Sequence, residues 1–454
     1  MTTATQQRLV VRAKEIIAAE LERYIERTAK SQRATGRARQ VIPLGVPSSF
    51  QAYDPHPIVA ARAHGSWIED IDGHRYVDLN MGFGALYVGH ANPVLLAALV
   101  DQLEDGLLYV TPCESNADAA VALRERFGLP QWRFTNSGTE ATMDAIRVAR
   151  GYTGRTRIVK VEGGYHGHHD AVMVSMKPSL VEAGPAHSPH SVPSTKGMGA
   201  GVLGDVTVIA FNDAEGLERA LAAGDVAAFI VEPVMQNIGI CMPQPGYLQA
   251  VRRICSQHGT ALIFDEVKTG ITAGWGGATR YFGVTPDLVC LAKSIGGGVP
   301  VGAFGGRPEF MDTITDKLVV HQGTYNGNPL SMVAVRTVLG TICTPAVMDA
   351  TAARNRRMLA ACQGVIDAHD LPAHTVEMGA KGCVTWSVDP IRNYRDYKAT
   401  DFDVAYAQWI WGINRGIMLP PGLDEQWLIS VMHTDADVDR HTQVFADFAD
   451  AITR

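Results

Sequence analysis

The sequence predicts an α/β fold: a large domain with a mostly parallel sheet flanked by helices, and a smaller α+β domain. Short apolar runs, amphipathic stretches between them and a helical pattern near the C-terminus carry this prediction. A parallel strand is buried on both faces, so continuous apolar runs separated by amphipathic segments are typical of such a sheet. The expected strands are 157–161, 206–211, 226–231, 261–264 and 288–292.

The chain of 454 residues is long enough for more than one domain. We expect an N-terminal arm and a segment contributing to the small domain and active site (1–94), a large cofactor-binding domain (95–340) and a C-terminal small α+β domain (341–454). The charge-rich stretch 5–40 favours a solvated helix over an arm that packs on a partner subunit. Residues 175–204, rich in Pro, Ser, Gly and His, predict a long functional loop or lid.

Composition excludes several classes of protein. The formal net charge of −7 argues against a nucleic-acid or anionic-membrane binder. The 7 cysteines form no CxxC pair, which predicts reduced thiols and a cytoplasmic protein. The N-terminus lacks an apolar core of signal-peptide length, and no apolar run is long enough to span a membrane. The 45 glycines exceed the average glycine content of proteins, and their excess indicates either low complexity or close approach of the backbone to a ligand.

Polar residues that follow the apolar runs are the candidate site residues, because ligands of open α/β sheets bind beyond the carboxyl ends of the strands. Ser137 and Glu140 have capping-box spacing. Ser137, Gly138 and Thr139 would offer hydroxyls and backbone N–H groups to a phosphate at a helix N-terminus. An ordinary helix cap explains this segment equally well.

An acid and a lysine end two of the predicted strands. Asp265 needs a cationic partner or a metal if buried, and a protonated heterocycle nitrogen would serve. Lys293 would be desolvated there, which lowers the pKa of its amine and makes it nucleophilic toward an aldehyde. The alternative is a lysine that extends from the strand end into solvent. Lys268 is a weaker candidate for this role, because no strand end and glycine run frame it as they frame Lys293.

The segment after the strand 157–161 contains Tyr165, which is well placed to stack on a planar ring. Nearby histidines also suggest a metal site, but the adjacent His168 and His169 point apart on regular structure and no second ligand cluster is obvious. We therefore predict no metal. The GxGxxG pattern at 199–204 precedes a strand instead of joining a strand to a helix, which argues against a dinucleotide site.

A phosphate cradle, an acid for a ring nitrogen, an imine-forming lysine and a stacking aromatic are the parts that hold pyridoxal 5'-phosphate (PLP). The sequence also resembles the class III (fold type I) PLP-dependent aminotransferases, within them the glutamate-1-semialdehyde 2,1-aminomutase-like branch. The resemblance covers roughly 40–440, and its motifs include FTNSGTEA (134–141), GGYHG (163–167), VEPV (231–234), FDEVKTG (264–270), LAKSIGGGVPVGAFGG (291–306) and HQGTYNGNP (321–329).

The resemblance implies roles for individual residues. Lys293 forms the imine with the cofactor and moves the substrate proton, Asp265 holds the pyridine nitrogen protonated, and Val267 and Tyr165 pack on opposite ring faces. Thr324 reaches the phosphate from the neighbouring subunit, which implies a homodimer with shared active sites. The implied cofactor-binding set is Ser137, Gly138, Thr139, Tyr165, His166, Glu232, Asn237, Asp265, Val267, Lys293 and Thr324.

One position departs from the branch. Aminomutases carry an arginine that binds the substrate carboxylate where this chain has Gln51. Replacing a charge-assisted, bidentate contact with a neutral one removes about 1.5–3 kcal/mol of binding. An arginine from elsewhere, such as Arg392 or Arg395, would compensate. We hypothesise a pocket for a less acidic, bulky or aromatic amino compound, and its expected lining is Ser48, Gln51, Tyr87 and Glu425.

The sequence therefore predicts an aminotransferase that moves an amino group between an amine or amino acid and a keto or aldehyde acceptor. A glutamate-1-semialdehyde aminomutase or another aminomutase is the alternative, and the long loop would suit the lid that such an enzyme needs. A racemase or epimerase on the same fold is a further alternative. A regulator that only senses PLP is disfavoured because the lysine and acid set is intact.

Overall fold

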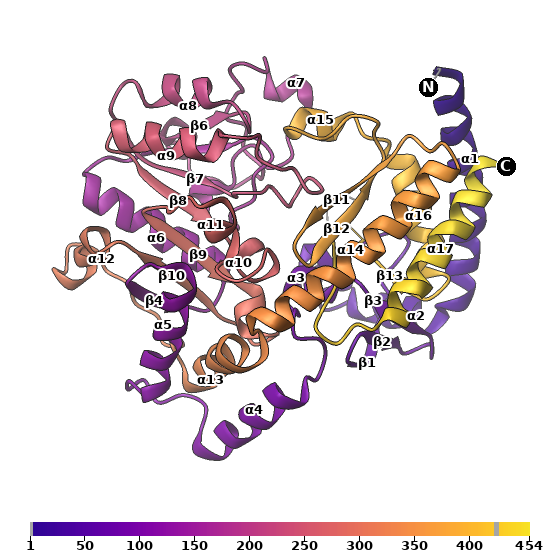
Figure 1. Cartoon of the computed structure of the whole chain (residues 1–454), viewed down its shortest axis with the longest axis horizontal. Helices are drawn as coiled ribbons and strands as arrows, with labels where there is room; N and C mark the ends of the chain where they lie inside the picture. The colour runs from indigo at the N-terminus through magenta and orange to yellow at the C-terminus, as the bar shows by residue number, and fades with distance from the viewer. Residues whose placement is uncertain (1–2, 422–425) are drawn as a thin grey trace.

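The computed structural model describes residues 3–421 and 426–454. Figure 1 shows two lobes: a larger one built around an extended sheet, and a smaller one that holds both chain termini. The larger lobe supplies the apolar strands predicted from the sequence. The smaller lobe packs beside the edge of that lobe at which α3 (Met81–Gly84) lies.

The large sheet has 7 strands in the order β4-β10-β9-β8-β7-β5-β6. Neighbours from β9 to β6 run parallel, whereas β10 is antiparallel to both β4 and β9. The mostly parallel sheet is therefore confirmed. The strands are β4 (Gln131–Thr135), β5 (Arg157–Val161), β6 (Val206–Ile209), β7 (Val226–Val231), β8 (Ala261–Asp265), β9 (Leu288–Ala292) and β10 (Gly302–Gly306).

Helices cover both faces of this sheet (Figure 1), as buried parallel strands require. Several begin at a side-chain cap: Ser137, Asp213 and Asn328 each accept a hydrogen bond from a backbone N–H of the first turn. The principal helices of this lobe are α4 (Pro93–Asp105), α5 (Glu114–Phe127), α6 (Gly138–Thr153), α8 (Ala214–Leu221), α9 (Tyr247–Gln257), α11 (Gly277–Phe282), α12 (Pro308–Thr315) and α13 (Pro329–Thr337).

The smaller lobe contains two sheets and the terminal helices. One sheet has the order β1-β2-β3-β13 and the other β11-β12-β14. The strands are β1 (Ala60–His64), β2 (Trp67–Asp70), β3 (Arg75–Asp78), β11 (His374–Met378), β12 (Lys381–Thr385), β13 (Ile417–Met418) and β14 (Trp427–Leu428). The helices are α1 (Thr3–Arg27), α2 (Ala29–Ala38), α14 (Pro345–Ala368), α15 (Tyr394–Lys398), α16 (Phe402–Ile413) and α17 (Asp435–Thr453).

The N-terminal helix corrects the expectation of a solvated segment. One face of α1 buries Leu9, Ala13 and Ile16 in the core of the smaller lobe, against α16 and α17. Tyr24 is fully buried and donates to the carbonyl of His56 at 2.8 Å. The apolar stripe has helical spacing but is masked in the sequence by the many charges on the opposite face.

The domain boundaries stay predictions, but the packing near them is informative. Tyr87 and Val88, before the expected boundary at 94/95, lie in the same core cluster as the large sheet. Cys343 and Met348, after the boundary at 340/341, lie in that cluster as well. The core of the larger lobe therefore draws on segments from both flanks.

Within the described ranges, no single helix is both long and apolar enough to cross a membrane. One sharply bent helix pair, Pro329–Ile342 with Pro345–Ala368, passes such a test by length and composition alone. All 7 cysteines are free thiols.

Candidate active site

A cavity of about 300 Å³ lies at the carboxyl ends of the central parallel strands, where the sequence placed the ligand. The polar segments that follow β4, β5, β7, β8 and β9 converge there, although they are far apart in the chain. The cavity is lined by ten of the predicted cofactor residues: Ser137, Gly138, Thr139, Tyr165, His166, Glu232, Asn237, Asp265, Val267 and Lys293.

One end of the cavity is an N-terminal helix turn. Ser137 caps α6, and its Oγ accepts the backbone N–H of Glu140 at 3.2 Å. Glu140 bonds to the backbone N–H of Asn136 at 2.6 Å, so only half of the predicted capping box forms. A Cβ on Gly138 would lie 2.9 Å from Val267 Cγ2. Glycine therefore allows this turn to pack closely, and its N–H groups suit an anion.

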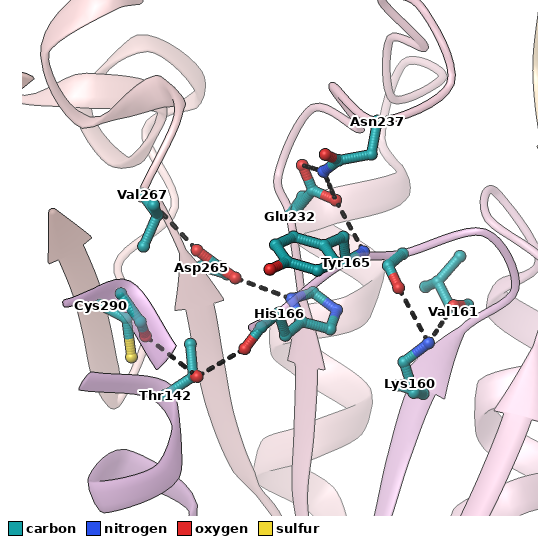
Figure 2. A network of polar contacts seen from close by, with 12 residues as sticks. Thr142, Lys160, Val161, Tyr165, His166, Glu232, Asn237, Asp265, Val267 and Cys290 are labelled. Atoms are coloured by element: carbon teal, nitrogen blue, oxygen red, sulfur yellow. Dashed lines mark hydrogen bonds and ion pairs between the residues drawn. The ribbon is translucent and has the colours of Figure 1, made fainter. Parts of the chain in front are cut away.

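A carboxylate faces the middle of the cavity. Asp265 ends β8 and is 4% exposed. Its Oδ2 lies 2.8 Å from His166 Nδ1, and its Oδ1 accepts the backbone N–H of Val267 at 3.0 Å. Figure 2 shows His166 beside this carboxylate, with Tyr165 close by. Because the carboxylate accepts, Nδ1 donates, and this hydrogen bond fixes the orientation of the Asp265 carboxylate.

The lysine follows β9 directly and lines the same cavity. Lys293 has a left-handed backbone, with φ of +54°. Such a conformation costs a non-glycine residue about 1–3 kcal/mol and is retained mainly at functional sites. Gly297 and Gly298, with φ of +58° and +107°, continue the turn behind it. The predicted strand end and glycine run are thus confirmed as structure.

Glu232 supplies a second carboxylate to the cavity, next to Asn237. Glu232 is 4% exposed, and it accepts the Asn237 side-chain amide at 2.9 and 3.0 Å. It also accepts the backbone N–H of Tyr165 at 3.3 Å, as Figure 2 shows. Burial raises the pKa of Glu232. This carboxylate therefore fixes the turn that carries Tyr165 relative to the segment that carries Asn237.

Lys268 also lines the cavity and is only 6% exposed. The sequence did not predict that Lys268 lies in the same cavity as Lys293. The available signal was its position three residues after Asp265, since a single turn brings both into one cavity. Phe50 was missed as well; its ring meets that of Tyr165 edge-on at 5.7 Å.

Thr324 lies outside this cavity. It is exposed and lines a different hollow of about 470 Å³, together with His321 and Asn326. The expected contact of Thr324 with the phosphate of a neighbouring subunit stays a prediction.

The expected substrate-binding residues divide into three groups. Ser48 and Gln51 are exposed and cap each other, with the Ser48 N–H donating to Gln51 Oε1 at 3.2 Å. Gln51 lines a further cavity of about 730 Å³, which Phe50 also lines. Tyr87 is 1% exposed, packs in the large core and is absent from the lining of the cavity at Lys293, so its part in substrate binding stays a prediction. Glu425 lies outside the described residues.

Arg395 does not reach the cavity as a carboxylate receptor. Its Nε and Nη2 each bond to Glu162 at 3.0 Å, and its Nη1 donates to the carbonyl of Gly184 at 2.7 Å. Glu162 is buried. The ion pair ties α15 to the residue after β5, and the hydrogen bond to Gly184 ties α15 to the segment 175–204, so the predicted loop is anchored at this point.

The histidines after β5 diverge. His166 faces Asp265, whereas His169 contacts Thr142 Oγ1 at 3.3 Å, and burial lowers the pKa of His169 to about 4. Across the described part of the chain, no group of three or more His, Cys, Asp or Glu side chains is arranged to hold a metal ion.

The donor set of the cavity fits a phosphorylated pyridine aldehyde. The helix turn at Ser137 suits a dianion, buried Asp265 suits a protonated ring nitrogen, and Lys293 supplies an amine. His166 Nε2 is buried with no hydrogen-bond partner among the residues described. The enclosure suits a flat, charged group held on several sides.

Comparison with known proteins agrees with this geometry. The family Aminotransferase class-III matches residues 49–383. The glutamate-1-semialdehyde 2,1-aminomutase of Archaeoglobus fulgidus is 37% identical over 421 residues, covering 92% of this chain and 99% of the relative.

Two solved structures share the fold. An omega-transaminase from Sphaerobacter thermophilus superposes with a TM-score of 0.88 at 34% identity, covering 93% of this chain and 97% of its own. A glutamate-1-semialdehyde aminomutase from Pseudomonas aeruginosa, in complex with PMP, has a TM-score of 0.90 at 27% identity, with 97% and 99% covered. The chain therefore belongs to the class III aminotransferases, PLP-dependent enzymes of fold type I.

Proposed function

We propose that the cavity holds PLP and that the chain moves an amino group on a small amino compound. The observation that carries this proposal is the meeting of Lys293, Asp265 and the Ser137 helix turn in one cavity. Bound PLP supplies an electron sink that stabilises negative charge on the carbon bearing the amino group.

Each residue of the cavity then has a task. Ser137, Gly138 and Thr139 bind the phosphate through the N-terminal turn of α6. Asp265 holds the proton on the ring nitrogen, and His166 orients that carboxylate at 2.8 Å. Lys293 holds the cofactor covalently through its amine and carries the proton to and from the substrate carbon.

The walls of the cavity orient the ring. Tyr165 and Val267 enclose its two faces, and the hydrogen bond from the Val267 N–H to Asp265 joins one wall to the acid. Asn237, held by Glu232, would face the phenolic oxygen of the bound cofactor. Walls on both faces would hold the ring in one orientation relative to the amine of Lys293.

For the reaction type, the relatives support the aminomutase better than the general aminotransferase predicted from the sequence. The curated relatives at 35–38% identity bear the name glutamate-1-semialdehyde 2,1-aminomutase. We therefore propose a shift of the amino group between neighbouring carbons of one substrate molecule. The anchoring of segment 175–204 through Arg395 suits an enzyme that must retain its intermediate.

Transfer between two molecules is the second candidate, and the lining near the cavity favours it. Gln51 stands where the resemblance places a carboxylate-binding arginine, and Arg395 is committed to Glu162. The basic residues that line the cavity within the described ranges are Lys268, Lys293 and His166, and no arginine is among them. A neutral amino compound then binds without an unmatched carboxylate.

Product analysis separates these candidates. The aminomutase reaction yields 5-aminolevulinate from glutamate-1-semialdehyde without any second carbonyl compound. An aminotransferase instead requires an acceptor such as pyruvate and produces alanine and a ketone. Loss of optical activity without amino transfer would indicate a racemase. Lys293→Ala should remove the visible cofactor band and turnover together; a variant that keeps both contradicts the whole proposal.

We further propose a homodimer in which Thr324 completes the partner's phosphate site. Exposed apolar side chains occur in segments 94–110 and 318–325, and two of them, Leu108 and Val110, line the same hollow as Thr324. Exposed apolar surface of this kind marks an interface. The exposed apolar side chains of the two segments are Val94, Leu96, Val100, Leu103, Leu107, Leu108, Tyr109, Val110, Leu318, Val320 and Tyr325.

Complementation tests the shared site. Sedimentation should give a dimer, and Thr324→Ala should weaken retention of PLP. Mixed dimers of Lys293→Ala and Thr324→Ala chains contain one intact site, so mixing two impaired variants should restore activity. If mixing leaves activity at the level of the separate variants, Thr324 acts within its own subunit or not at all.

A further inference from the structure

Lys268 is a second lysine in the cofactor cavity, and the chemistry proposed above gives it no role. It is 6% exposed and lines the same cavity as Lys293. It follows Asp265 by three residues, at the start of the short helix α10 (Thr269–Thr272). The turn that presents the acid therefore also places an ammonium at the site.

The contacts of Lys268 place it on one side of the cavity. Its Nζ donates to the carbonyl of Gln236 at 2.6 Å, next to Asn237. Its charge acts on Glu232, where it opposes the effect of burial on the pKa of that carboxylate. Glu232, Asn237 and Lys268 thus form a polar cluster, which we call the Glu232 cluster.

The structure of PLP indicates which group meets this cluster. In PLP, the phenolic oxygen lies on the ring carbon next to the aldehyde carbon, on the side away from the phosphate arm. The Ser137 turn takes the phosphate, Asp265 takes the ring nitrogen and Lys293 takes the aldehyde carbon. The phenolic edge then faces the Glu232 cluster, which contains the ammonium.

We propose that Lys268 is a catalytic residue that contacts PLP, a proposal that rests on the cofactor proposed above. Its ammonium stabilises the negative phenolic oxygen and disfavours protonation of the neighbouring imine nitrogen. The other ionisable residues that line the cavity are Tyr165, His166, Glu232, Asp265 and Lys293. Lys268 thereby adjusts the fraction of cofactor that is ready for attack by the amine substrate.

The pH titration of the visible cofactor band tests this role. A neighbouring positive charge lowers the pKa of a cationic acid, so its removal raises the pKa of the band. Lys268→Met and Lys268→Gln should raise it by about one to two pH units, whereas Lys268→Arg should stay near the wild type. Lys268→Gln can retain a hydrogen bond to the Gln236 carbonyl. It therefore distinguishes the effect of losing the positive charge from the effect of losing that hydrogen bond.

A buried lysine elsewhere provides a matched control. Lys160 is fully buried and is absent from the cavity lining. Its Nζ donates to the carbonyls of Val161, which Figure 2 shows beside it, and of Gly164 and Val174. Lys160→Met should leave the pKa of the band within a few tenths of a pH unit. Burial lowers the pKa of Lys160 to about 7. An equal shift in this variant would overturn the assignment, because the shift would then not depend on a lysine that lines the cofactor cavity.

A cofactor analogue tests whether Lys268 acts through the phenolic oxygen of PLP. With PLP, Lys268→Gln should bind cofactor about tenfold more weakly than wild type, and with an analogue lacking the phenolic oxygen this difference should disappear. Equal losses with both cofactors, or an unchanged pKa of the band in both neutral variants, refute the inference. A wild-type protein that forms no visible band with PLP refutes the proposed function instead.

Discussion

The ion pair between Arg395 and Glu162 permits a quantitative test of how the smaller lobe holds the site. Arg395→Met removes the guanidinium but keeps a long apolar side chain. In the wild type, two guanidinium nitrogens lie 3.0 Å from the Glu162 oxygens. The side chains of Arg395 and Glu162 are 21% and 1% exposed, so the carboxylate has little access to water.

The magnitude follows from this burial. Removing one partner of a buried ion pair leaves an uncompensated charge, which costs about 3–5 kcal/mol of unfolding free energy. The variant also frees the carbonyl of Gly184, which accepts from Arg395 at 2.7 Å. We therefore expect a loss of about 3–5 kcal/mol together with faster proteolysis within segment 175–204.

Urea unfolding followed by circular dichroism measures the loss. Glu162→Gln removes the buried charge, so the double variant should be less destabilised than the sum of the single variants. Arg392→Met is the control, because Arg392 is exposed three residues away and should change stability by no more than about 0.5 kcal/mol.

One result would refute the reasoning. If Arg395→Met lost less than about 1 kcal/mol and raised KM only for substrates with a carboxylate, Arg395 would be a substrate receptor. The bidentate contact with Glu162 would then be replaced when substrate binds. Equal KM values for acidic and neutral substrates would support the structural role.

Three further predictions follow from the site and the core. Gly138→Ala should speed loss of PLP on dialysis, because the new Cβ would meet Val267 at 2.9 Å, whereas Gly364→Ala, with open space around it, should not. Asp265→Asn should retain PLP but slow proton removal, measured as a larger deuterium isotope effect on turnover. Burial lowers the pKa of His441 from 6.5 to about 4, so its neutral form is the folded one. The stability contributed by burying neutral His441 is fully present above about pH 6.5 and declines as pH falls toward 4. About 2 kcal/mol of unfolding free energy should be lost by pH 5. His441→Gln should remove this part of the pH dependence of the urea midpoint.

Strand positions were predictable where apolar runs are long and uniform. The run that became β7 is buried along its whole length, which matches its sequence of Val, Ala, Phe and Ile. The strand β10, Gly302–Gly306, was not predicted as a strand, since glycine disfavours strands in isolation. Its glycines are required by neighbours instead: a Cβ on Gly305 would meet the Trp132 ring at 2.5 Å. Only the packed sheet reveals that requirement.

The same contrast holds at the site. Lys293 and Asp265 could be found because strand-end position and residue type are local properties of the sequence. The burial of Tyr87 in the large core could not be predicted, because the environment of a side chain on an irregular turn depends on which elements pack around it.

The sequence by itself determined the large α/β sheet, the residues that converge on the cofactor cavity and the family to which they belong. The tertiary structure alone decided that Arg395 pairs with Glu162, that Tyr87 lies in the core and that Lys268 joins Lys293 in one cavity. Strand ends and helix caps arise from contacts among near neighbours in the chain. Ion pairs and cavity linings arise between residues that only the folded chain brings together.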